Sequence, residues 1–451
     1  NNTSEEMGDD ITLLPDDRPS FWKMVTHPQY RIHRFIALAF MCFMGFGNYF
    51  VYDIPGSLQS KITSDMNVNT AAFGTLYSVY SWPNVIISFF GGFLIDRVFG
   101  IRLGAVVFAS IVLAGQLVFA FGGIVNRFWV MQLGRFIFGL GGENLAVTQN
   151  TYAVSWFQGK ELNMVFGFQL SFARVGSTVN FLVMGKLYNY LKTYYTGYTC
   201  LGIALIIASS TCVFSLLSSI ILGFMDKRAE KLLNRSEGKT GEVIKLTDVR
   251  YFSFKFWMLS LICVTSYTAI FPFVGLGTVF FMQKYDLQFD DANTIDGFAY
   301  LMSAIMSPIL GLLVDLTGRN LLWIFSSTLI LLASHVVFTF TTWNPWFPVV
   351  LLGLGYSVMS SALWPMVALV IPEHQLGTAY GAMQSIQNLG LAIAPLIAGY
   401  LIDYKGYIVL EVFFLACLCL CVLCNVILFM SDAQGDGILN MSRKQRAEMQ
   451  K

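Results

Sequence analysis

The chain has 451 residues, of which 55% are hydrophobic and only 12% are charged. A soluble domain carries about 25% charged residues, so the composition excludes an ordinary soluble enzyme and a disordered protein. The formal net charge of +1, from 28 Lys and Arg against 27 Asp and Glu, gives no sign of nucleic acid or another polyanion as a partner. The composition predicts an all-α integral membrane protein.

The polar N-terminal tail, residues 1–34, carries a short motif in which Asp9 precedes Leu13 and Leu14. This Asp-x-x-x-Leu-Leu pattern resembles the acidic dileucine signals that clathrin adaptors read for sorting to lysosomes. Such signals are addresses read by a receptor and require an accessible, unfolded segment. The tail therefore predicts an adaptor as a partner and the lysosomal membrane as the location.

Apolar runs long enough to cross a bilayer follow one another from Phe35 to Met430. A helical span needs about 20 apolar residues, and turns and charges separate twelve such spans. The runs predict an N-terminal six-helix bundle over 35–225, a cytosolic linker over 226–255, a C-terminal six-helix bundle over 256–430 and a tail over 431–451. The expected spans are 35–58, 72–96, 103–123, 128–154, 161–189, 198–225, 256–283, 294–315, 321–341, 346–371, 376–402 and 408–430.

The positions of Lys and Arg indicate the orientation of these spans. With both termini in the cytosol, the inner loops hold Arg97, Arg102, Lys160, Arg319 and the basic linker, whereas the outer loops hold only scattered positive residues. The positive-inside rule therefore predicts that both termini are cytosolic.

An internal repeat relates the two halves of the chain. Five glycines in the fourth and fifth expected spans each have a glycine partner 214 residues later, in the tenth and eleventh spans. Small residues at such spacings let helices approach closely in a bilayer. Duplication of a six-helix half explains the coincidence and predicts two pseudo-symmetric bundles. The pairs are Gly139 and Gly353, Gly141 and Gly355, Gly167 and Gly381, Gly176 and Gly390, and Gly185 and Gly399.

Two loops share a pattern that identifies a family. Gly92-Phe-Leu-Ile-Asp96-Arg97-Val-Phe-Gly100-Ile-Arg102 follows the second span, and Gly311-Leu-Leu-Val-Asp315-Leu-Thr-Gly318-Arg319 follows the eighth. Both resemble the cytosolic signature loop of the major facilitator superfamily, although the first has one extra residue before its glycine. Arg135-x-x-x-Gly139-x-Gly141 in the fourth span resembles another pattern of that superfamily. The resemblance covers residues 35–430 and implies the major facilitator fold, in which these charged residues latch the cytosolic gate.

Three further runs narrow the resemblance to a lysosomal branch of the superfamily: Gly47–Gly56, Gly141–Asn144 and Ser171–Gly176. The resemblance implies passive transport of dipeptides and a heavily glycosylated lysosomal membrane protein as accessory subunit. The glycosylation triplets of the chain support such a partner independently. All of them fall in segments expected in the cytosol, so the chain would lack glycans of its own on the lumenal side. They begin at Asn1, Asn2, Asn234 and Asn440.

Glu143 and Arg174 are the charges expected deepest in the membrane. Each lies about 20 Å along its helix, in two adjacent antiparallel spans, so both are expected near the midplane. Charges inside spans are costly and mark functional sites, although the two could also neutralise each other as a structural pair. The positions 214 residues later, Ser357 and Asn388, are uncharged. This asymmetry favours a substrate with two charged ends, bound against the first bundle.

In that interpretation Arg174 binds a carboxylate and Glu143 an ammonium group, while the second bundle supplies hydrogen bonds and apolar walls. The candidate wall residues are Gln384, Asn388, Trp364, Tyr356 and Tyr300, and weaker candidates in the first span are Asn48, Tyr49 and Asp53. No cofactor and no metal site are expected, because the four histidines show no metal-binding spacing. No pair of residues shows the spacing of a catalytic nucleophile and its general base, so the sequence does not indicate an enzyme.

The sequence thus predicts a lysosomal transporter that moves dipeptides from lumen to cytosol by alternating access, as a uniporter. Two alternatives remain open. One is an organic anion or sugar carrier of the same fold, in which Glu143 carries a coupling proton. The other is a protein of this shape that senses a ligand without transporting it.

Overall fold

The computed structural model describes residues 25, 27–28, 30–93, 100–157, 162–233, 246–371, 376–435, 437–442 and 445. Within these residues the fold is helical, and one isolated β-bridge joins Gly318 and Ser442. The long helices of the first half are α2 (Arg31–Tyr52), α5 (Thr70–Phe93), α6 (Gly100–Ile124), α7 (Phe128–Trp156), α8 (Leu162–Leu191) and α9 (Gly197–Leu233). Those of the second half are α10 (Phe254–Tyr285), α11 (Phe289–Thr317), α12 (Asn320–Phe340), α13 (Trp346–Val370), α14 (Leu376–Lys405) and α15 (Tyr407–Gln434).

In the described part of the chain, nine of these helices are long and apolar enough to cross a membrane. The other three, α5, α7 and α8, have the right length but are not apolar enough by the same measure over their described residues. The deep charges Glu143 and Arg174 lie on two of them. The prediction of an all-helical membrane protein is confirmed, and its least apolar helices are the ones that carry the candidate site.

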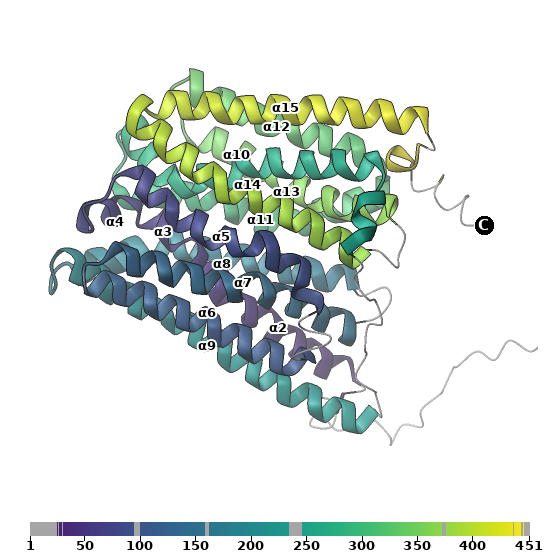
Figure 1. The fold of residues 1–451 in the computed structure, drawn as a ribbon, viewed down its shortest axis with the longest axis horizontal. Helices are drawn as coiled ribbons and strands as arrows, with labels where there is room; N and C mark the ends of the chain where they lie inside the picture. The colour runs from purple at the N-terminus through teal and green to yellow at the C-terminus, as the bar shows by residue number, and fades with distance from the viewer. Residues whose placement is uncertain are drawn as a thin grey trace, which may run out of the picture.

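The two halves lie side by side in Figure 1, the first half coloured from purple to teal and the second from teal-green to yellow. Their largest contacts join α5 to α14 and α8 to α11. These are the second and fifth long helices of each half, exchanged between the halves. Such an exchange is what a pseudo-two-fold axis between two copies of one bundle produces.

The glycine repeat has a direct structural meaning. A Cβ on Gly139 would lie 2.3 Å from the carbonyl oxygen of Tyr80 on α5, and one on Gly353 would lie 2.8 Å from that of Ala299 on α11. Gly185 and Gly399 likewise face the equivalent helices α11 and α5. The two glycines of such a pair therefore permit equivalent helix crossings, within each half for Gly139 and Gly353 and between the halves for Gly185 and Gly399.

The first span is broken where the sequence places a proline. Helix α2 ends at Tyr52, and the short helices α3 (Ile54–Ser57) and α4 (Gln59–Asp65) follow it. Because Pro55 has no N–H group, it cannot donate to the carbonyl of Val51 four residues earlier. The Val51 carbonyl accepts the N–H of Asp53, only two residues later, instead. A further donor from a buried side chain would help to satisfy it inside the membrane.

Helix α9 is longer than the expected span over 198–225, because it continues to Leu233. Its last two turns place Asp226 and Glu230 on one face, where both meet Arg102. Residues 226–233 of the expected linker are therefore helical and packed against the first half.

Contacts between the halves reach one end of the molecule, which we call the distal end. It holds α4 and the turn between α8 and α9, and it lies opposite the C-terminus in Figure 1. There the Asp403 carboxylate accepts hydrogen bonds from the N–H groups of Thr70 and Ala71, at 3.1 and 2.7 Å. On the other side of the interface, Asn189 donates to Asp290 at 3.2 Å. Toward the opposite end, α9 and α15 diverge (Figure 1).

Candidate functional site

Arg174 is a buried cation near the middle of α8. It is only 6% exposed, and its two terminal nitrogens reach across to the second half. Nη1 donates to the hydroxyl of Ser307 on α11 and Nη2 to that of Ser360 on α13, each at 2.9 Å. The guanidinium also lies 4.7 Å from the centre of the Tyr356 ring. All of these partners are uncharged.

Glu143 occupies a comparable position on α7, where it is half-buried. The Tyr80 hydroxyl donates to Oε1 at 3.4 Å, and Nε2 of Gln384 on α14 donates to Oε2 at 3.4 Å. Both distances are long for hydrogen bonds to a carboxylate, which are usually 2.9 Å or shorter. The Glu143 carboxylate therefore accepts hydrogen bonds from both halves, but these long bonds compensate its charge only weakly.

The two deep charges do not neutralise each other. Among the described residues, no carboxylate lies within the 4.0 Å limit of an ion pair with the Arg174 guanidinium. The structural interpretation, a buried ion pair of Glu143 and Arg174, is thus wrong. Tyr49 on α2 interacts electrostatically with both groups, which places it in their neighbourhood. The site presents one cation and one anion separately.

An aromatic wall from the second half extends away from Arg174. The rings of Tyr356 and Tyr267 meet edge to face at 6.2 Å, and Nε1 of Trp364 donates to the Tyr267 hydroxyl at 3.3 Å. Tyr300 packs against Tyr356 at 6.4 Å on the other side. The candidates Tyr356 and Tyr300 are therefore linked to the arginine through ring contacts, and Trp364 through its hydrogen bond to Tyr267, a residue that the sequence did not single out.

The two candidate asparagines donate hydrogen bonds to different helices of the first half. Nδ2 of Asn388 donates to Ser88 on α5 at 3.3 Å, and Nδ2 of Asn48 donates to the carbonyl of Gly142 at 3.4 Å. The Oδ1 atoms of Asn48 and Asn388 are buried without a hydrogen-bond partner in the described part of the structure. A buried amide oxygen without a donor costs free energy, so both oxygens are available to a ligand donor or a water.

Two buried carboxyl groups lie between Arg174 and the distal end. The Tyr300 hydroxyl donates to Oδ1 of Asp53 at 3.1 Å, and the Thr278 hydroxyl donates to Oδ2 of Asp296 at 3.1 Å. Asp53 was a weak sequence candidate, and Asp296 was missed because it lies only two turns into α11. Its position after the first turn of an apolar span was a signal that could have identified it.

The signature residues are only partly described. Asp96 and Arg97 lie outside the described residues, as do Asp9, Leu13 and Leu14 of the sorting motif, and of Asp315 only the backbone is described. Arg319 adopts a left-handed conformation with φ of 55°, and its N–H donates to the Met441 carbonyl at 3.0 Å. This bond ties the second signature loop to the segment after α15.

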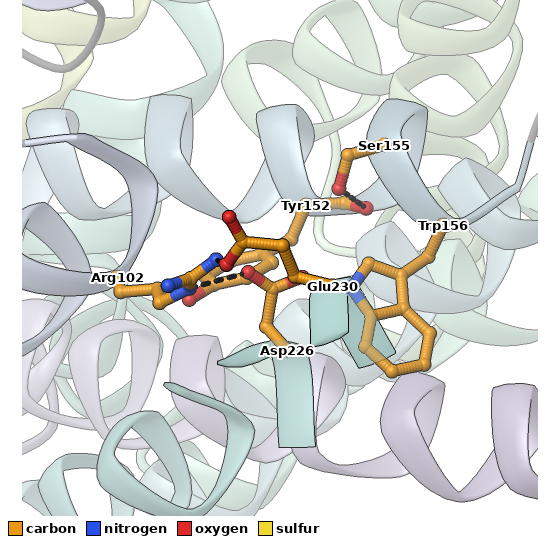
Figure 2. Close-up of polar contacts among 6 residues, drawn as sticks. All are labelled: Arg102, Tyr152, Ser155, Trp156, Asp226 and Glu230. Atoms are coloured by element: carbon orange, nitrogen blue, oxygen red, sulfur yellow. Dashed lines mark hydrogen bonds and ion pairs between the residues drawn. The ribbon is translucent and has the colours of Figure 1, made fainter. Parts of the chain in front are cut away.

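Arg102 of the first signature loop anchors a polar cluster (Figure 2). Its Nε lies 2.8 Å from Oδ2 of Asp226, and its Nη2 pairs with Glu230. The indole nitrogen of Trp156 donates to the other oxygen of Asp226 at 2.9 Å. The cluster joins α6, α7 and α9 within the first half, at the end opposite the distal end.

Arg135, which the sequence pattern grouped with the gate residues, lies within the first half and is fully buried. It donates to the carbonyl oxygens of Val51 at 3.2 Å and Tyr52 at 3.0 Å, where α2 breaks before Pro55. The guanidinium supplies donors to both carbonyls at the break, in addition to the Asp53 N–H at Val51, and Lys could not serve two separated carbonyls as well. The described contacts of Arg135 thus stabilise the broken first span.

Comparison with known proteins gives consistent results. The model of the Major Facilitator Superfamily matches residues 41–395 and also residues 259–450. The chain is 56% identical over 429 residues to the lysosomal dipeptide transporter MFSD1 of Danio rerio, which covers 95% of this chain and 93% of that protein. It is 55% identical over 424 residues to the human protein of the same name, covering 94% and 91% of the two chains.

Solved structures show the same fold at low sequence identity. A bacterial homologue of the human lysosomal transporter Spinster, in an inward-facing and unoccupied conformation, superposes with a TM-score of 0.66 at 13% identity, covering 89% of this chain and 97% of that one. A bacterial homologue of the human drug peptide transporters PepT1 and PepT2 superposes with a TM-score of 0.67 at 13% identity, covering 88% and 98%. With its duplicated six-helix halves and its family match over most of its length, the chain belongs to the Major Facilitator Superfamily, a family of transporters.

Proposed function

We propose that this protein transports dipeptides across the lysosomal membrane by alternating access, with Arg174 binding the carboxylate and Glu143 the ammonium group of the substrate. The observation that carries the proposal is that Arg174 is buried and Glu143 half-buried between the halves, and that the two are not paired with each other. A dipeptide is a zwitterion whose two charged ends would supply both missing counter-charges at once. The names of the relatives, lysosomal dipeptide transporters, agree with that substrate.

The geometry of each charge suits its proposed ligand. A carboxylate is planar and can accept two parallel hydrogen bonds from the fork of a guanidinium. An ammonium group needs acceptors, which the Glu143 carboxylate and the partnerless Oδ1 of Asn48 beside Gly142 would supply. The aromatic wall of Tyr356, Tyr267 and Trp364 would then border the substrate side chains.

In this proposal the distal end faces the lumen, both termini lie in the cytosol, and transport runs from lumen to cytosol without a coupled ion. The site lies between the halves, because Arg174 and Glu143 of the first half contact residues of the second. Rocking of the halves would therefore expose the site to the lumen and to the cytosol in turn. A glycosylated lysosomal membrane protein would cover the distal surface as accessory subunit, since the glycosylation triplets all lie elsewhere.

The test is counterflow of a labelled dipeptide in liposomes that contain the purified full-length protein. Arg174→Lys and Glu143→Gln should each reduce flux roughly 10- to 100-fold, because a hydrogen bond to a charged group contributes about 1.5–3 kcal/mol. Arg127→Lys, the same exchange at the exposed start of α7, is the matched control and should leave flux unchanged.

Blocked peptides make the test specific for the two charges. N-acetylated and C-amidated dipeptides should compete weakly in the wild type, and acetylation should matter much less once Glu143 is Gln. Equal competition by free and blocked dipeptides would show that the two residues do not bind the peptide termini. Exchange of other organic anions or sugars instead of dipeptides would favour the alternative carrier. Binding without any exchange would favour a ligand sensor.

A further inference from the structure

The hydroxyls of Ser307 and Ser360 occupy both terminal nitrogens of the Arg174 guanidinium. Each bond is 2.9 Å long, and each crosses from the first half to the second, to α11 in one case and α13 in the other. The serines are themselves 7% and 8% exposed. We call this arrangement the serine bridge.

A carboxylate that binds a guanidinium through two parallel hydrogen bonds needs two of its N–H groups on one edge. In the serine bridge the two terminal nitrogens already donate to groups of the opposite half. Tyr356 covers one face of the same guanidinium at 4.7 Å. A guanidinium has five N–H groups, and the two serines take one on each terminal nitrogen. A substrate carboxylate that binds the edge formed by Nη1 and Nη2 therefore competes with the serine hydroxyls for these nitrogens.

We propose that Ser307 and Ser360 act as an internal substitute for the substrate carboxylate, which links substrate binding to separation of the two halves. This inference rests on the proposed function, because it assigns a role to residues of the same site. Without substrate, the bridge holds α8 against α11 and α13. When a carboxylate takes over the guanidinium, the bridge opens and α8 is free to move relative to the second half.

Two neighbouring contacts show that the bridge is part of a built interface. The Ser171 hydroxyl, on the same helix as Arg174, donates to the Ala304 carbonyl on α11 at 2.9 Å. The Ser303 and Ser307 hydroxyls lie 3.4 Å apart, so Ser307 retains a partner when it releases the arginine. The Ser307 hydroxyl therefore still has a hydrogen-bond partner after a substrate carboxylate has replaced it at Arg174.

The proposal predicts that removal of the hydroxyls increases substrate affinity. An interhelical hydrogen bond in a membrane changes an equilibrium constant by about a factor of three on average. Each of Ser307→Ala and Ser360→Ala should therefore lower the dissociation constant of a free dipeptide about threefold. The double variant should lower it further, whereas the affinity for the C-amidated dipeptide should not change. Replacement of both serines by Thr, which keeps the hydroxyls, should restore the wild-type value.

Ser361→Ala is the matched control. Ser361 is the next residue on α13, and its hydroxyl donates to the backbone carbonyl of Ser307 at 3.4 Å rather than to Arg174. A loss of affinity in Ser307→Ala and Ser360→Ala, or a gain that Ser361→Ala shares, would overturn the proposal. In the first case the serines would position the arginine for the substrate instead of competing with it.

A second measurement needs no dipeptide. Asn189→Cys and Asp290→Cys place two thiols where α8 and α11 are hydrogen-bonded at the distal end, and their oxidative cross-linking reports closure of the ligand-free protein. The Ser307→Ala/Ser360→Ala variant should cross-link several-fold more slowly than Ser361→Ala. An unchanged rate would overturn the bridge as a link between the halves. If wild-type protein binds no dipeptide but the rate still falls, the proposed substrate is wrong and the bridge stands.

Discussion

At the scale of single residues, the second half contains a buried pair that is separate from the candidate site. Nδ1 of His335 on α12 lies 2.8 Å from Oε2 of Glu411 on α15, and the two side chains are 0% and 1% exposed. The rings of Phe273, Phe338 and Phe414 surround the imidazole. The pair joins two helices through apolar surroundings where neither group could be left alone.

We expect the pair to stabilise the fold without serving transport. His335→Leu or Glu411→Leu alone should lower the free energy of unfolding by about 3 kcal/mol, because either change leaves a buried polar group without its partner. The double variant should cost clearly less than the sum of the two changes. Thermal and denaturant unfolding in detergent would measure this cycle.

Val336→Ala is the control for that cycle, since Val336 is the next residue on α12 and is 39% exposed. Strictly additive effects of the two leucine changes would contradict the pairing. Loss of dipeptide counterflow in a double variant of normal stability would show that the pair does take part in transport.

At the scale of helices, Asp403 at the end of α14 caps a helix of the opposite half. Its two carboxylate oxygens accept the first N–H groups of α5, those of Thr70 and Ala71. These groups have no partner within their own helix, and a negative charge there also interacts favourably with the helix dipole. One turn further along α5, this helix packs closely against α14, since a Cβ on Gly74 would lie against the carbonyl oxygen of Pro395.

We predict that Asp403→Ala favours opening of the distal end. A helix-capping side chain contributes about 1 kcal/mol, so its loss should shift the equilibrium between closed and open forms about fivefold. Spin labels at the distal ends of α5 and α14 would report the two populations in the purified protein. Asp291→Asn, which removes a negative charge from the same end but from α11, is the control. Equal populations in Asp403→Ala and Asp291→Asn would contradict the role of the cap.

At the scale of the whole molecule, we expect the predicted sorting motif to act independently of the transport fold. Asp9, Leu13 and Leu14 precede Arg31, the first residue of α2, in the sequence and lie outside the described residues. Leu13→Ala together with Leu14→Ala should therefore divert the protein to the plasma membrane while dipeptide counterflow in liposomes remains normal. Microscopy of the variant and flux of the purified protein would test the two halves of this prediction. Unchanged lysosomal staining would mean that another segment or a partner carries the signal.

The helices and their symmetry were predictable because their signals are local. The length of an apolar run sets the length of a span, and glycines recur where helices of a duplicated half cross at the same point. One departure was the first span, expected over 35–58, which ends at Tyr52 and breaks into α3 and α4. Another was in α9, whose apolar run ends at about residue 225 while the helix continues to Leu233. Its extension depends on the pairing of Asp226 and Glu230 with Arg102, which no local pattern reveals.

For the site, the sequence alone determined that Glu143 and Arg174 lie deep in adjacent spans, since depth follows from counting residues along a helix. Only the tertiary structure decided that the two charges do not pair, that Ser307 and Ser360 hold the arginine, and that Arg135 serves a broken helix. The physical reason is that packing sets the rotation of each helix about its own axis. Which side of a helix faces which neighbour depends on all the long helices together. Serines are common in membrane helices, so the ones that contact a charge are identified by their place in the fold and not by their type.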